Sequence, residues 1–155
     1  MMRATTAAAI LLLATVAKAE DSLIEIVTRE VKGCMDSEHL GSIGGLRSYN
    51  DPNSAEQKCF LGCMLKKFKA LDADGQYSAE GLKTTIQHCP RMKSHPDIQK
   101  AALQVADECN GKVTGCSDYC SCAPLAAKCL HEGMKNKSFQ TIFIALDEAL
   151  DKMQS

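Results

Sequence analysis

One stretch of the chain, residues 58–67, decides its fold class and reads KCFLGCMLKK. Its two cysteines, Cys59 and Cys63, are four positions apart, which places both on one face of a helix. We expect each of them to form a disulfide with a different neighbouring helix. A helical shell that is cross-linked in this way can stay folded around a hollow interior. The stretch therefore predicts an all-α protein and favours ligand carriage over catalysis.

The N-terminus has the features of a secretory signal peptide. Arg3 supplies the positive start, and the apolar run at residues 7–17 is shorter than the roughly 20 residues that span a bilayer. Ala17-Lys18-Ala19 fits the small-x-small cleavage pattern. We expect residues 1–19 to be removed and residues 20–155 to form a single secreted domain. In an oxidising compartment, the nine cysteines predict disulfides before metal ligands.

The charge of the chain is nearly balanced. It has 18 lysines and arginines against 19 aspartates and glutamates, a formal net charge of −1. This balance gives no electrostatic basis for binding nucleic acid or anionic membranes. No segment after the signal peptide is apolar enough to insert into a membrane, so we expect neither kind of partner.

Helix signals recur along the chain, and no strand pattern or internal repeat accompanies them. Ser22 with Glu25, and Ser54 with Gln57, form capping boxes that begin two predicted helices. Further starts are predicted at Ser78, at Pro96 and at Ser117, while glycines at 41, 44 and 45 predict a weak helix or a loop.

Two features complicate the C-terminal part of this pattern. Pro124 should kink the helix that runs from Ser117 toward Cys129, or force it to start later. Beyond Cys129, apolar residues at helical spacing predict an amphipathic helix from Ser138 onward. We expect this seventh helix either to cover the core or to close a ligand cavity with Phe139, Ile142, Phe143 and Leu146.

Metal binding and catalysis find little support. Asp72-Ala73-Asp74-Gly75 begins like a calcium loop, but the sixth and twelfth positions are Tyr77 and Lys83 instead of Gly and Glu, so a polar turn is predicted. No nucleophile elbow, metalloprotease motif or phosphate-binding loop is present, and we expect no enzyme activity, metal or cofactor. Disulfides are favoured over a zinc site for the clustered cysteines. The candidate zinc ligands would be three cysteines and two histidines: Cys116, Cys120, Cys122, His88 and His131. Asn136-Lys137-Ser138 is an N-glycosylation sequon.

Six of the nine cysteines follow a family pattern, with three residues between the second and third and eight between the fifth and sixth. Residues 58–67 look much like the third helix of that family, and residues 71–75 like the turn after it. From about Ser22 to Cys129, the chain thus resembles the insect odorant-binding proteins, the pheromone and general odorant-binding family.

The resemblance implies a compact bundle of six α-helices around an apolar pocket, to which the final helix adds a seventh. It implies the disulfides Cys34–Cys63, Cys59–Cys120 and Cys109–Cys129. It also implies reversible carriage of small hydrophobic molecules such as odorants or pheromones, with a membrane receptor or self-association as further partners. Three cysteines lie outside the pattern and mark a divergent member: Cys89, Cys116 and Cys122. We expect one extra bridge from Cys89 to Cys116 or Cys122, with the odd cysteine free or in an intermolecular bond.

Candidate pocket residues are the apolar positions of the central and final helices: Phe60, Met64, Phe68, Leu82, Ile86, Leu103, Phe139 and Phe143. Two alternatives remain. A salivary, reproductive or haemolymph carrier of the same fold could take lipids or amines, and amines would need a buried carboxylate such as Asp107, Glu108 or Asp118. A disulfide-rich structural or defence protein would have a filled core.

Overall fold

The computed structural model describes residues 25–42 and 54–136 and confirms the all-α class. Within these ranges no β-strand forms, and one isolated bridge joins Leu71 to Tyr77. The predicted helix from Ser138 and most of the glycine-rich segment lie outside the described residues. The helices are residues 25–37, α2 (Ala55–Lys67), α3 (Ala79–His88), α4 (Pro90–Lys93), α5 (Pro96–Asn110) and α6 (Tyr119–Asn136).

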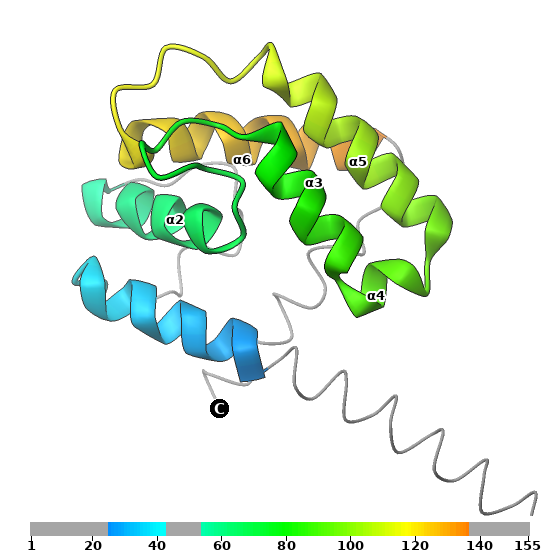
Figure 1. Cartoon of the computed structure of the whole chain (residues 1–155). Helices are drawn as coiled ribbons and strands as arrows, with labels where there is room; N and C mark the ends of the chain where they lie inside the picture. Colours follow the sequence, from blue (N-terminus) through cyan, green and yellow to red (C-terminus); the bar gives the residue numbers. More distant parts are fainter. Residues whose placement is uncertain (1–24, 43–53, 137–155) are drawn as a thin grey trace, which may run out of the picture.

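The helices pack as two pairs, which a contact between α5 and α6 joins (Figure 1). α2 lies along α6, and α3 packs against α5, with the short α4 between them in the chain. α5 also contacts α6, so α6 lies between α2 and α5. Residues 25–37, drawn in blue, flank α2 on the side away from α6.

The local signals that begin α2, α3 and α5 act as predicted. At α2 the hydroxyl of Ser54 accepts from the backbone N–H of Gln57 at 3.1 Å, and the Gln57 side chain accepts from the backbone N–H of Ser54 at 3.3 Å. The Ser78 hydroxyl accepts from the N–H of Gly81 at the start of α3. Pro96 occupies the first turn of α5, where its missing N–H leaves no intrahelical bond unmade.

The start of α6 differs from the prediction. The helix begins at Tyr119, and the carboxylate of Asp118 accepts from the N–H of Ser121 at 2.8 Å, so Asp118 takes the capping role expected of Ser117. Pro124 lies inside the helix and does not delay its start. At this interior position proline lacks the N–H that would bond to the carbonyl of Cys120, a loss that ordinarily kinks or weakens a helix at a cost of about 3 kcal/mol.

Two main clusters of side chains form the core. One lies between residues 25–37 and α2 and includes Val31, Phe60 and Met64. The other joins α3, α5 and α6 around Val105 and Cys122. Within the described residues every buried side chain is apolar. The clusters therefore stabilise the fold by burying apolar surface, at roughly 25 cal/mol per Å².

The turn between α2 and α3 is the polar turn that the sequence predicts. One carboxylate oxygen of Asp72 accepts from the backbone N–H groups of Asp74 and Gln76, at 2.9 and 3.0 Å. The hydroxyl of Tyr77 then donates to the carbonyl of Ala106 on α5 at 2.7 Å. This bond anchors the turn to the neighbouring helix.

Tyr77 is expected to make stability fall in alkaline solution. Burial, helped by the negative charge of Asp107, raises the pKa of Tyr77 from 10.0 to about 12. Between these values the unfolded chain has already lost the phenol proton that the folded chain keeps. The free energy of unfolding should therefore fall as pH rises from about 10 to about 12, by up to about 1.4 kcal/mol per pH unit from this group.

Urea unfolding of the parent and of Tyr77→Phe over this pH range tests the expectation. The variant should show a shallower fall, because its side chain cannot ionise. The same slope in both proteins would assign the alkaline loss of stability to other groups.

Candidate functional site

Three disulfides fix the helices to one another. Cys34–Cys63 joins residues 25–37 to α2, and Cys59–Cys120 joins α2 to α6. Cys109–Cys129 joins α5 to α6. The two cysteines on one face of α2 thus bond with different helices, as the i, i+4 spacing predicts, and the pairs are those that the family resemblance implies. The frame holds its helices at set positions without any contribution from a ligand.

The extra cysteines pair differently from the prediction. A fourth disulfide joins Cys116 to Cys122, with Cα atoms 4.9 Å apart, and Cys89 is the free thiol. The prediction that Cys89 would take part in the extra bridge is therefore wrong. Because α6 begins only at Tyr119, Cys116 lies in the preceding loop, where the chain can turn back. Gly115 aids the turn by adopting a φ of +76°, which side chains other than glycine rarely adopt.

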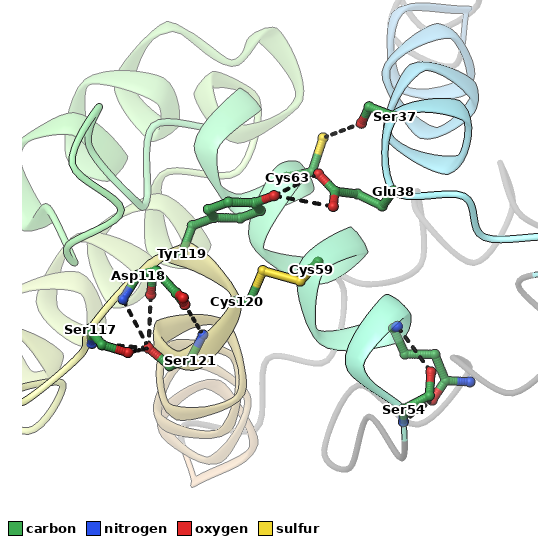
Figure 2. Close-up of a disulfide and its surroundings, with 11 residues drawn as sticks. Ser37, Glu38, Ser54, Cys59, Cys63, Ser117, Asp118, Tyr119, Cys120 and Ser121 are labelled. Atoms are coloured by element: carbon green, nitrogen blue, oxygen red, sulfur yellow. Dashed lines mark hydrogen bonds between the residues drawn. A yellow bond between two sulfur atoms is a disulfide. The ribbon is translucent and has the colours of Figure 1, made fainter.

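Tyr119 is the meeting point of three helices, as Figure 2 shows. Its hydroxyl donates to both oxygens of the Glu38 carboxylate, at 3.0 and 3.1 Å, directly after the helix of residues 25–37. Lys66 of α2 places its ammonium 5.2 Å from the ring centroid. Burial and the bond to Glu38 raise the pKa of Tyr119. Tyr119 is not among the residues predicted from the sequence, where the one signal available is its position beside Cys120.

The structure divides the six described pocket candidates between the two clusters. Phe60, Met64 and Phe68 belong to the cluster of residues 25–37 and α2, whereas Leu82, Ile86 and Leu103 belong to the other. Phe60, Met64 and Ile86 are buried, at 4%, 5% and 8% exposed. Phe68, Leu82 and Leu103 are only partly covered. Phe139 and Phe143 lie outside the described residues.

Hydrogen bonds hold the helices that carry the partly covered candidates. The hydroxyl of Thr85 on α3 donates to the carbonyl of Phe68 at 2.8 Å, just past the end of α2. The side-chain amide of Gln99 on α5 donates to the carbonyl of Ile86 at 3.4 Å. α3 is thereby tied both to the end of α2 and to α5.

Two surface hollows lie elsewhere, and neither is lined by a pocket candidate. The first, of about 350 Å³, lies by the α2–α3 turn and is bordered by Lys66, Lys69 and Asp72. The second, of about 380 Å³, lies between α5 and α6. Both open to solvent and carry charged side chains at their borders, unlike a closed apolar cavity.

The described residues bring together no group of three or more side chains that could hold a metal ion, and the carboxylates considered for amine binding are not buried. Asp107, Glu108 and Asp118, the carboxylates considered for amine binding, are all exposed. Cys116, Cys120 and Cys122 are all in disulfides, so none offers a thiolate to a metal. Among residues 25–42 and 54–136, no helix is long and apolar enough to cross a bilayer.

Comparison with known proteins assigns the chain to a family. The model of the PBP/GOBP family matches residues 17–133. Among solved structures, the odorant-binding protein dmelOBP28a from Drosophila melanogaster superposes with a TM-score of 0.63 and 20% sequence identity, over 77% of this chain and 98% of that one. At that identity the likeness shows a shared fold. No curated protein sequence matches the chain. Because the family model covers most of its length, the chain belongs to the PBP/GOBP family, which confirms the resemblance that its cysteine pattern indicates.

Proposed function

We propose that the protein is a secreted carrier that reversibly binds small hydrophobic molecules, such as odorants or pheromones, in an apolar pocket. The family match over residues 17–133 carries the proposal. The name of its structural neighbour, an odorant-binding protein, supports the same class of ligand. The protein performs no chemistry on its ligand in this proposal, and it needs no cofactor.

The disulfide frame suits a carrier. A cavity removes packing contacts and lowers stability. Disulfides offset that loss, by about 2–4 kcal/mol each, because they restrict the unfolded chain. Four such bonds lie in the described residues. They also fit an oxidising compartment, which supports removal of residues 1–19 as a signal peptide during secretion.

We assign the described pocket candidates to two roles. Phe68, Leu82 and Leu103 keep apolar surface that the described residues leave partly uncovered, so they are proposed to contact the ligand. Phe60, Met64 and Ile86 are proposed to support the pocket from the core. Phe139 and Phe143 of the predicted seventh helix are proposed to complete the wall of the pocket or to close its opening. Glycosylation at Asn136, the last residue of α6, stays a prediction.

A pair of leucine variants tests the pocket. Leu103→Ala should weaken binding of an environment-sensitive hydrophobic dye about five- to thirtyfold, which corresponds to about 1–2 kcal/mol of lost apolar contact. Leu125→Ala removes the same side chain from an exposed site on α6, at 47% exposed, and should leave the affinity unchanged. Fluorescence titration of the oxidised proteins, with displacement by a small apolar compound, measures both.

Two outcomes would count against the proposal. If Leu103→Ala and the parent bound the dye with equal affinity, Leu103 would not contact the ligand. If the folded, fully oxidised parent bound no dye, the carrier function itself would be contradicted. A structural or defence protein with a filled core would then be favoured.

A further inference from the structure

One peptide bond of the chain joins an asparagine to a glycine, and it lies where α5 ends. Asn110 is the last residue of the helix, and Gly111 caps it. Both residues are exposed, and nothing comes within 4 Å of a Cβ added at Gly111. The described chain therefore leaves open space around this peptide bond.

The backbone N–H of Gly111 is weakly held. It donates to the carbonyl of Cys109, which also accepts from the N–H groups of Lys112 and Val113, at 3.1 and 3.0 Å. A carbonyl oxygen has two lone pairs, so three donors compete for it. The Gly111 N–H can leave this carbonyl without depriving it of a partner, and the last turn of a helix opens at little cost.

The pair Asp74-Gly75, in the turn between α2 and α3, has the opposite surroundings. Gly75 is buried, and its N–H donates to the carbonyl of Asp72 at 3.0 Å. A Cβ at Gly75 would meet backbone atoms of Tyr119, so the turn is packed against the start of α6. The Gly75 nitrogen cannot approach the preceding side chain unless the turn moves away from α6.

We infer that the open end of α5 makes Asn110 a site of spontaneous deamidation. The backbone nitrogen of Gly111 attacks the side-chain carbonyl carbon of Asn110, and the new C–N bond closes a succinimide ring. The bond from that carbon to the amide nitrogen Nδ2 breaks, and ammonia leaves with the proton of the Gly111 nitrogen. Water then opens the ring at either carbonyl carbon, which leaves aspartate or isoaspartate at position 110.

Either product alters the end of α5. A carboxylate at position 110 adds negative charge to the C-terminus of the helix, where the helix dipole disfavours it and where Asp107 and Glu108 are already acidic. Isoaspartate also lengthens the backbone by one carbon between Cys109, which is bonded to Cys129, and the buried Val113. The reaction needs water and no ligand, so it is independent of the proposed carrier function.

Storage of the oxidised protein in warm, mildly alkaline buffer, followed by peptide mass spectrometry, tests the inference. The parent should gain one dalton at Asn110, and a protein isoaspartate methyltransferase should label part of the product. The matched variant Asp74→Asn creates the same asparagine–glycine pair in the buried turn. Position 74 should react at least about tenfold more slowly than Asn110 in the same molecule, because the Gly75 hydrogen bond must break and the turn must leave α6.

Unfolding supplies the second comparison. In reduced, urea-unfolded Asp74→Asn protein the two positions should react at similar rates, because neither is then held by the fold. If Asn110 of the folded parent kept its amide over the time in which the unfolded protein reacts, the inference would be overturned. Equal rates at the two positions of the folded variant would also overturn it, since the open end of α5 would then give Asn110 no advantage.

Discussion

Replacing Cys59 and Cys120 by serine should lower the free energy of unfolding by about 4 kcal/mol. The disulfide closes the longest loop among the four, with a sequence separation of 61 residues, so its loss restores the most freedom to the unfolded chain. It is also the disulfide that joins α2 to α6, beside the Tyr119 junction (Figure 2). Urea denaturation, extrapolated to water, measures the change.

The double variant Cys116→Ser/Cys122→Ser is the matched control. It also removes two sulfurs near the start of α6, but its disulfide spans a separation of only 6 residues. The entropy of closing so short a loop corresponds to about 2 kcal/mol. If both double variants lost the same stability, loop length would not explain what these disulfides contribute. Cys89 should be blocked in all samples so that it cannot exchange with the remaining disulfides.

Gly62→Ala should destabilise the protein by about 2 kcal/mol, although alanine is the better helix former by about 1 kcal/mol. A Cβ at Gly62 of α2 would clash with the carbonyl oxygen of Tyr119 and lie 2.7 Å from a carbon of its ring. Backbone atoms of Tyr119 cannot move away easily, because the next residue, Cys120, is bonded to Cys59 on α2. The substitution should therefore force α2 and α6 apart.

Gly33→Ala shows what the same substitution does without a neighbour. Gly33 lies on the helix of residues 25–37, it is exposed, and nothing comes within 4 Å of its added Cβ. Gly33→Ala should raise the free energy of unfolding by about 0.5–1 kcal/mol, because glycine loses more conformational freedom on folding than alanine does. A Gly62→Ala protein as stable as Gly33→Ala would show that α2 and α6 can separate freely at Tyr119.

Local signals in the sequence predicted the starts of α2, α3 and α5, because capping depends on residues within one turn. Ser54 with Gln57 at α2, and Ser78 at α3, form the expected hydrogen bonds. The predicted cap of α6 was one residue too early, at Ser117 instead of Asp118. The Cys116–Cys122 pairing was missed because it depends on how the loop before α6 turns back, and the sequence does not specify that path.

The candidate site was less accessible to sequence reasoning. An apolar residue in a filled core and one that contacts a ligand recur at the same helical spacing. The pattern therefore could not separate Ile86, which is buried, from Leu103, which is partly covered. The contact between Tyr119 and Glu38 joins residues 81 positions apart and follows from the arrangement of whole helices. Only the disulfides gave long-range information in advance, through the cysteine spacing of the family.

Isothermal titration of a long-chain alcohol into the oxidised mature protein tests the central claim most directly. A carrier with an apolar pocket should bind at one saturable site, and the binding enthalpy should become more favourable as temperature rises, since burial of apolar surface gives a negative heat-capacity change. The absence of saturable binding, in protein shown to be helical and to have four intact disulfides, would contradict the account.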